Sequence, residues 1–225
     1  PHALLLALTV PSDWRDDVAE LADGVGELAA SVGASVVGGN LTAGDALSLT
    51  ITVIGSARSP MPRTGIRPGN TLYVTGTLGG PQAALAAFLA GSTPPDAARA
   101  RFARPVPRIA EARWLAGHGC VAGIDISDGL LADAENLAAA SAVRIVLDAA
   151  SIPLHPGVSA ADAATGGEEY ELLVAARTPL DTVAFTQRFG LPLTRIGTVV
   201  EGAAAVVADG LARVANPAGH SHFSA

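Results

Sequence analysis

Two aspartates lie close together where a predicted strand meets a predicted helix. Asp125 falls at the end of the apolar stretch 121–126, and Asp128 precedes a helical pattern three residues later. Carboxylate oxygens suit Mg²⁺, and the free N–H groups of a helix's first turn favour a phosphate nearby. Gly129 would let a ligand approach the backbone closely. A simpler alternative, which the spacing alone favours, is that Ser127 and Asp128 only cap the helix.

A second candidate site is the acidic segment Glu168-Glu169-Tyr170-Glu171, which follows two glycines and leads into an apolar stretch. Three carboxylates within four positions repel one another. A bound cation or a cationic ligand would relieve that repulsion, and exposure to solvent would do so equally well. Tyr170 could stack on an aromatic ring or pack in a core. Taken alone, the segment favours the solvent-exposed alternative.

The third candidate is residues 38–44, a glycine-rich stretch that we expect to form a loop between two strands. Asn40 and Thr42 carry side-chain oxygens that could touch a phosphate or a metal ion, although alone the stretch is an ordinary turn. No Gly-x-x-x-x-Gly-Lys-Ser/Thr motif occurs in the sequence, so a nucleotide would have to be bound in another way.

Two further patterns carry less weight. The histidines in His220-Ser221-His222 are spaced i, i+2 near the chain end, which defines no metal site, and the lone Cys120 is expected to be a small packing residue. The formal net charge of −7 makes nucleic acid an unexpected partner. The apolar run 3–10 is far shorter than the ~20 residues that span a bilayer, so we expect a cytoplasmic protein.

Alternating strand and helix patterns would position these candidates. The Pro-, Gly- and Arg-rich stretch 56–70 is the expected boundary between two units. Helices are expected at 18–32, in several pieces within 81–117, at 128–141 and at 180–189. Strands are expected at 3–10, 35–37, 47–54, 72–75, 121–126, 144–147, 169–176, 194–200 and 204–208.

Taken together and in order, these segments resemble the thiamine-monophosphate kinase family, within the aminoimidazole ribonucleotide synthetase-like ATP-binding proteins. The resemblance implies an α+β fold of two α/β-type units with mixed or antiparallel sheets and flanking helices. Residues 1–57 would be the C-terminal part of an ATP- and Mg-binding N-terminal domain, and residues 58–225 a C-terminal domain that completes the active site. The matching segments are 37–40, 63–70 with 73–76, 104–108, 125–130, 166–172 and 219–223.

The sequence departs from the family pattern at several points. Asn40, Asn70 and Glu169 stand where the family commonly has Asp. The family's N-terminal Gly-Asp-Asp segment, which carries further Mg²⁺ ligands, has no counterpart here. We therefore expect the N-terminal portion to be missing, and we expect the chain as written to bind Mg-nucleotide weakly and to show little kinase activity.

The activity implied by the resemblance is ATP-dependent phosphorylation of thiamine phosphate to thiamine diphosphate, with several Mg²⁺ ions and a homodimer when full-length. Alternatives are another ATP-using member of the superfamily, resembling aminoimidazole ribonucleotide synthetase, and a non-catalytic remnant. The implied residues are Asp128 and Asp125 for catalysis; Asp128, Asn40 and Asp125 for metal; Arg63, Ser127, Gly129 and Thr42 for nucleotide or phosphate; and Glu169, Tyr170 and Phe223 for substrate.

Overall fold

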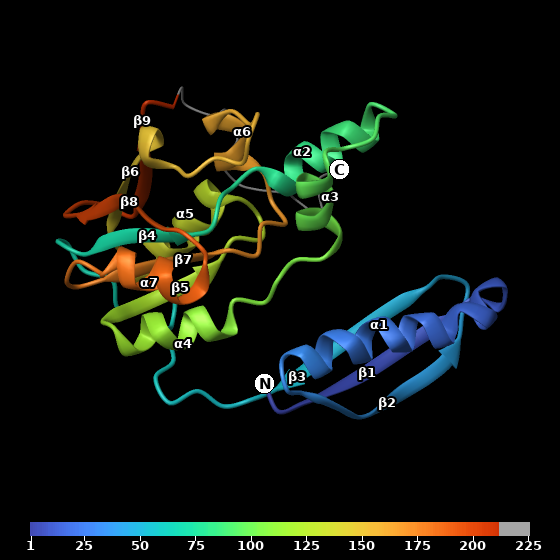
Figure 1. The fold of residues 1–225 in the computed structure, drawn as a ribbon. Coiled ribbons are helices and arrows are strands. Elements are labelled where there is room, and N and C mark those ends of the chain that lie inside the picture. Colours follow the sequence, from blue (N-terminus) through green and yellow to red (C-terminus); the bar gives the residue numbers. More distant parts are fainter. Residues whose placement is uncertain (212–225) are drawn as a thin grey trace. The chain divides into compact units, whose positions relative to one another are not determined.

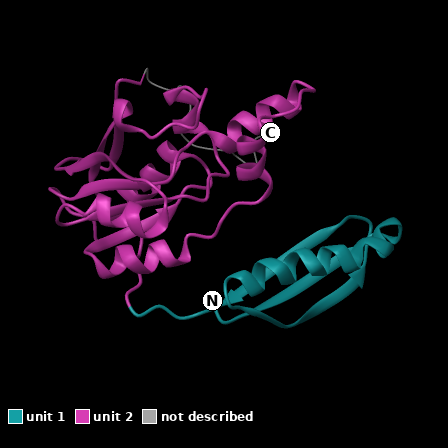
Figure 2. Cartoon of the chain, in the orientation of Figure 1, with its two compact units in different colours: residues 1–58 teal, residues 59–225 magenta. Residues whose placement is uncertain are grey.

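The computed structural model describes residues 1–211 and divides the chain into two compact units. Unit 1 is Pro1–Arg58 and unit 2 is Ser59–Ala225 (Figure 2). The division falls inside the Pro-, Gly- and Arg-rich stretch 56–70. Each unit has its own sheet and its own buried residues, so each is described by itself.

Unit 1 is a three-stranded sheet in the order β2-β1-β3, with α1 lying along it (Figure 1). The central strand β1 runs parallel to β2 and antiparallel to β3. Leu4 of β1 packs with Ala29 of α1 in a small core. The elements are β1 Ala3–Val10, the 3₁₀ helix η1 Ser12–Asp17, α1 Val18–Ser31, β2 Ser35–Ala43 and β3 Ser48–Ile54.

The expected loop at residues 38–44 is wrong, because β2 continues through Ala43. Asn40 pairs with Ala7 of β1, and Thr42 pairs with Thr9. The two glycines that suggested a turn have another role at Gly39, where a Cβ atom would lie 1.8 Å from the carbonyl oxygen of Leu6. Gly39 therefore allows two strand backbones to approach each other closely.

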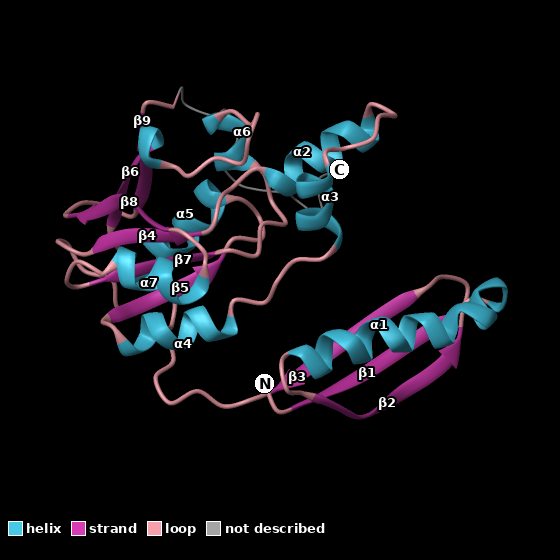
Figure 3. Cartoon of the chain, viewed as in Figure 1, coloured by secondary structure: helices cyan, strands magenta, loops and turns pink. Residues whose placement is uncertain are grey.

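Unit 2 is built on a six-stranded sheet in the order β5-β7-β4-β8-β6-β9, antiparallel except for the β6–β9 pair, with flanking helices (Figure 3). The strands are β4 Thr71–Thr75, β5 Cys120–Asp125, β6 Arg144–Asp148, β7 Leu172–Ala176, β8 Leu193–Val200 and β9 Ala205–Asp209. The helices are α2 Gly80–Leu89, α3 Asp96–Ala103, α4 Ile109–Gly117, α5 Leu130–Ser141, η2 Ala149–Ser151, α6 Ala160–Thr165 and α7 Thr182–Phe189.

Both faces of this sheet are covered, which explains why its strands read as continuous apolar runs rather than alternating ones. In β4, Leu72 and Val74 belong to one buried cluster with α5, while Tyr73 belongs to a second cluster with Leu115 of α4 and Phe185 of α7. Successive strand residues point to opposite faces, so the alternation between clusters marks the two faces. The predicted α+β fold of two units with mixed or antiparallel sheets and flanking helices is confirmed.

Two predicted element starts need correction. The strand expected from Glu169 begins at Leu172, because Glu168 and Tyr170 adopt left-handed backbone with φ of 63° and 52°. The helix expected from Asp128 begins at Leu130, after Gly129 at φ 113°.

The structure bears on the expected packing role of Cys120 and on whether any helix could span a membrane. Cys120 is buried in the second core cluster, and burial raises the pKa of its thiol to about 12, which agrees with the expected packing role. Among residues 1–211, no helix has both the length and the apolar character needed to cross a membrane.

Candidate active site

The turn between β5 and α5 presents two carboxylates at the surface. Asp125 is the last residue of β5 and Asp128 lies two residues before α5 begins. Both are exposed, and within residues 1–211 neither side chain has a hydrogen-bond or ion-pair partner. Two oxygen-bearing anions are therefore open to a ligand at one end of the sheet.

Asp133 in the first turn of α5 fixes the backbone of this turn. Its buried carboxylate accepts hydrogen bonds from the backbone N–H of Ser127 at 3.0 Å and of Asp128 at 3.1 Å. Burial raises the pKa of Asp133, its two backbone donors lower it, and the charges of Asp128 and Asp125 raise it further. Asp133 is therefore the side chain that satisfies the backbone N–H groups of Ser127 and Asp128.

The alternative in which Ser127 and Asp128 cap the helix is therefore wrong. The N-cap of α5 is Gly129, and no side chain makes a capping hydrogen bond there. The glycine has a structural reason, because a Cβ atom at this left-handed position would lie 2.8 Å from the carbonyl oxygen of Thr165. With no capping role for its side chain, Asp128 is left free to bind a ligand.

The acidic segment lies directly against this turn. The backbone N–H of Glu168 donates to the carbonyl of Ser127, and that of Tyr170 donates to the carbonyl of Ile126, both at 2.8 Å. The N–H of Ile126 donates in return to the carbonyl of Glu171 at 2.8 Å. These bonds continue the pairing of β5 with β7 past the end of β5 and ahead of the start of β7, in an irregular form.

Side chains in this segment alternate between surface and interior. Glu168 and Tyr170 are exposed, and the Tyr170 hydroxyl donates to the Glu168 carboxylate at 2.8 Å. This bond raises the pKa of Tyr170 to about 12, together with burial and the charges of Glu168, Asp125 and Asp128. Because the backbone bonds join this segment to residues 126 and 127, the exposed Glu168 and Tyr170 lie next to the turn that carries Asp125 and Asp128.

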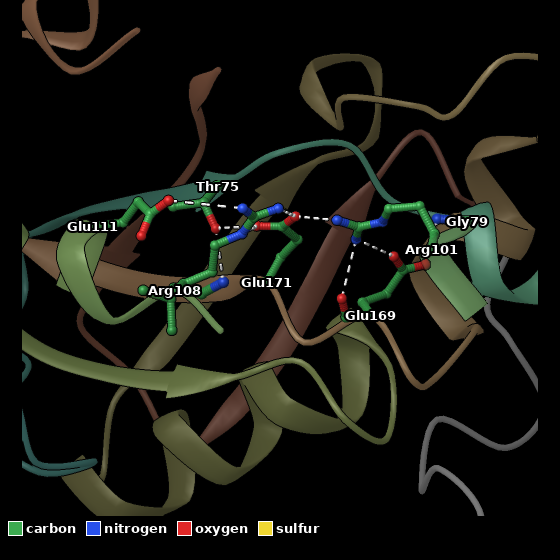
Figure 4. Close-up of polar contacts among 8 residues, drawn as sticks. Thr75, Gly79, Arg101, Arg108, Glu111, Glu169 and Glu171 are labelled. Carbon is green, nitrogen blue, oxygen red and sulfur yellow. Dashed lines mark hydrogen bonds and ion pairs between the residues drawn. The ribbon is translucent and has the colours of Figure 1, made fainter. Parts of the chain in front are cut away.

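The other two acids of the segment point inward, where arginines meet them (Figure 4). Glu171 is fully buried and receives two hydrogen bonds from Arg108, at 2.9 and 2.6 Å, and one from Arg101. The hydroxyl of Thr75 in β4 donates to the same carboxylate at 2.6 Å. The far side of the Arg108 guanidinium lies 3.7 Å from Glu111 of α4.

Glu169 is equally buried and bridges two helices. Its carboxylate accepts from the backbone N–H of Gly79, at the start of α2, and from Arg101 of α3 at 3.2 Å. The same arginine donates to the Glu169 carbonyl at 3.0 Å. Burial raises the pKa of Glu169 to about 7, against the lowering effects of Gly79 and Arg101.

Glu169 is buried in this structure, and the expectation that it contacts a substrate stays a prediction. The cation that relieves the crowded acids is supplied by Arg101 and Arg108 of the protein itself, and the carboxylate of Glu169 has no free surface. Sequence reasoning missed these arginines as site residues. The sequence contained a hint of this contact. Three acids lie close together at 168–171, a cluster of arginines lies at 99–108, and opposite charges of this kind favour pairing in the fold.

The remaining predicted residues lie in different places. Asn40 and Thr42 are exposed on β2 of unit 1, and Arg63 is exposed in unit 2 before β4. Asn70 is buried, and its side-chain oxygen accepts a 3.0 Å bond from the Arg67 backbone, which closes a turn. Three residues lie outside the described part of the chain: Phe223, His220 and His222.

The described residues fit a Mg²⁺ site in which the protein supplies two carboxylates and the other ligands come from substrate phosphates and water. No group of three or more His, Cys, Asp or Glu side chains within residues 1–211 is arranged to hold a metal ion. Mg²⁺ is commonly held by one or two carboxylates together with substrate phosphates and water, and Asp125 with Asp128 supply such a pair. Their oxygen-only chemistry suits Mg²⁺ better than softer metals.

Comparison with known families matches both units. The model of the AIR synthase related protein N-terminal domain matches residues 1–57, and the corresponding C-terminal domain matches residues 67–210. Among solved structures with the same fold are hydrogenase maturation proteins HypE, one from E. coli with a TM-score of 0.70 and 21% identity.

Relatives of higher identity carry one name. The thiamine-monophosphate kinase of Methanopyrus kandleri is 37% identical over 93% of this chain and 67% of its own length. The chain spans only 62% of the Rhodopirellula baltica relative and 58% of the Mycobacterium tuberculosis one.

Solved structures agree with this pattern. Thiamine-monophosphate kinase from Stenotrophomonas maltophilia has a TM-score of 0.85 and 32% identity, over 93% of this chain and 72% of that one. AaThiL complexed with AMPPCP and TMP has a TM-score of 0.86 and 30% identity, over 99% and 74% of the two chains. The chain therefore belongs to the thiamine-monophosphate kinase family of AIR synthase related proteins.

Proposed function

We propose that this protein transfers the γ-phosphoryl group of ATP to the phosphate of thiamine phosphate. A phosphate oxygen of thiamine phosphate forms a bond to the γ-phosphorus, the bond from that phosphorus to the bridging oxygen breaks, and thiamine diphosphate and ADP leave. The observation that carries the proposal is the pair of exposed carboxylates, Asp125 and Asp128, whose side chains have no polar partner within residues 1–211, on a chain whose relatives bear this activity in their names.

The chemistry explains why acids rather than a strong base are expected here. The accepting phosphate oxygen is already ionised near neutral pH, so the barrier lies in bringing two polyanions together in line. Bound Mg²⁺ would neutralise phosphate charge. Asp128 and Asp125 would hold such ions, and Asp133 holds the Asp128 backbone in place for that purpose.

Other residues of unit 2 receive roles by position. Ser127, half-buried in the turn before α5, would contact phosphate, and Arg63 would pair with a phosphate as an exposed cation. Gly129 is buried, so its expected contact with phosphate stays a prediction. Because Glu169 is buried, we assign the positively charged thiazolium to its exposed neighbours Glu168 and Tyr170, which offer a carboxylate and an aromatic face. Roles for Asn40, Thr42 and Phe223 stay predictions.

The direct test incubates the protein, expressed from its complete reading frame, with ATP, MgCl₂ and thiamine phosphate. We expect thiamine diphosphate, detected by chromatography after oxidation to its fluorescent thiochrome, with one ADP formed per turnover. Formylglycinamidine ribonucleotide replaces thiamine phosphate in a parallel reaction. If ATP is consumed with formylglycinamidine ribonucleotide but not with thiamine phosphate, the proposal is contradicted and the synthetase-like alternative is favoured.

Two properties of the full-length protein stay predictions. Sedimentation equilibrium would show whether it forms the expected homodimer, and a single species of monomer mass at micromolar concentration would contradict that expectation. A cytoplasmic location is checked by fractionating cells and probing each fraction with an antibody.

A further inference from the structure

The segment that carries Glu168 and Tyr170 adopts an unfavourable backbone conformation. Both residues have left-handed φ values, 63° and 52°, and neither is glycine. Left-handed backbone is disfavoured for residues with a Cβ atom, so contacts elsewhere must hold the segment in this shape. Two sets of contacts do so, one on each side.

The outer contacts are the backbone bonds from Glu168 to Ser127 and from Tyr170 to Ile126. Among the inner contacts, Arg101 of α3 meets three acceptors of the segment, whereas Gly79 meets only Glu169 and Thr75 only Glu171. The acceptors of Arg101 are the carboxylate of Glu169, the carbonyl of Glu169 and the carboxylate of Glu171.

Arg101 is the inner contact that bridges the strained part. Arg108 also binds Glu171, but within the described residues it makes no hydrogen bond to Glu169. A guanidinium carries several donors in a fixed plane, so one arginine can satisfy acceptors at positions 169 and 171 together. The residue between them, Tyr170, is thereby turned outward.

We infer that Arg101 is a positioning residue: by holding Glu169 and Glu171 inward it sets the left-handed backbone that presents Glu168 and Tyr170 beside Asp125 and Asp128. The inference deepens the proposed function, on which its kinetic part rests. It assigns to α3 control over affinity for the cationic half of the acceptor substrate, without direct contact with that substrate.

The test compares Arg101→Lys with the parent protein, expressed from its complete reading frame. Lysine keeps one positive charge next to the buried acids, so the fold is expected to survive, but a single ammonium cannot reproduce the planar set of donors. Arg99→Gln is the matched control on the same helix, because Arg99 is exposed and its one ionic partner among residues 1–211 is the exposed Asp96, at 3.9 Å.

The first measurement is hydrogen exchange of the backbone amides of Glu168 and Tyr170, followed by mass spectrometry or NMR. In Arg101→Lys we expect these two amides to exchange at least about tenfold faster, while β5 and β7 keep their protection. Unchanged protection of both amides in a folded variant would overturn the inference, and this holds even if the protein proves not to be a kinase.

The second measurement is steady-state kinetics with both substrates. We expect the KM for thiamine phosphate to rise on the order of tenfold in Arg101→Lys, with the KM for ATP changed less than about threefold. A rise in the ATP KM instead, or a rise in the thiamine phosphate KM with amide protection intact, would contradict positioning through the segment. If Arg101→Lys fails to fold, Glu169→Gln, which removes the charge that Arg101 meets at position 169 and leaves the contact of Glu171 with Arg108 in place, gives the same exchange comparison.

Discussion

Two acidic regions of unit 2 lie side by side and have opposite environments. Asp125 and Asp128 are exposed and have no polar side-chain partner among the described residues, whereas Glu169 and Glu171 are buried against arginines. The backbones of the two regions are joined by hydrogen bonds around Ile126. Acids that the protein neutralises itself fix the shape of the site, and acids that it leaves unpaired remain available to cations from solution. Substitutions in the two regions should therefore fail in different ways.

The largest effect is expected at Glu171, on the stability of the fold. Glu171→Ala would leave Arg108 and Arg101 buried or half-buried without their shared carboxylate and would remove the partner of the Thr75 hydroxyl. Breaking a buried ion pair from one side costs about 3–5 kcal/mol. In urea unfolding, the midpoint concentration of Glu171→Ala should be lower than that of the parent protein, and the free energy of unfolding should fall by this amount. A loss below about 1 kcal/mol would contradict the assigned role of the network.

The next largest effect is expected at Asp128, on turnover alone. Asp128→Asn keeps the shape but removes the negative charge from the proposed metal site, which should lower kcat on the order of a hundredfold or more. Because the Asp128 side chain caps nothing, the free energy of unfolding should change by no more than about 0.5 kcal/mol. Turnover across a Mg²⁺ titration checks this. Near-normal turnover at moderate Mg²⁺ would exclude Asp128 as a required ligand.

A smaller, pH-dependent effect is expected from Glu169. Burial raises its pKa from 4.5 to about 7, so the folded protein binds the proton more tightly than the unfolded chain does. Its contribution to stability is therefore full below about pH 4.5 and is lost as the pH rises through about 7. Between about pH 5.5 and 8 this loss amounts to about 2 kcal/mol.

Glu169→Gln supplies the comparison, since glutamine does not titrate. The difference in unfolding free energy, parent minus variant, should fall over that pH range. A difference that stays constant or increases with pH would show that Arg101 and the Gly79 N–H outweigh burial and keep Glu169 ionised.

The comparison also shows what the sequence could predict. The turn at Asp125 and Asp128 was located correctly, because both residues are neighbours in sequence and follow a continuous apolar strand. Most strands and helices were located for the same reason, since periodicity is a local property. The exact starts of β7 and α5 were missed, because left-handed backbone at Glu168, Tyr170 and Gly129 depends on contacts outside each segment.

The ion network shows the limit more clearly. Arg101 and Glu171 are 70 positions apart, and their contact is made when the segment before β7 meets the end of α3. The sequence indicates that crowded acids need cations, but it does not say whether those cations belong to the protein or to a ligand. Only the burial of Glu169, with arginine beside it, decides in favour of the protein.

The smallest effect is expected at Tyr170, and it tests whether the exposed region reads the substrate through an aromatic face. Tyr170→Phe keeps the ring and removes the hydroxyl that donates to Glu168 at 2.8 Å. Since that bond is at the surface, stability should change by less than about 0.5 kcal/mol. If the ring face contacts the thiazolium, the KM for thiamine phosphate should change less than about threefold in Tyr170→Phe. It should rise several-fold more in Tyr170→Ala, because a cation over an exposed ring is worth about 0.5–1 kcal/mol. Equal effects of the two substitutions would point to the hydroxyl and its hydrogen bond with Glu168 instead, so the pair separates recognition by the ring from recognition by the acid.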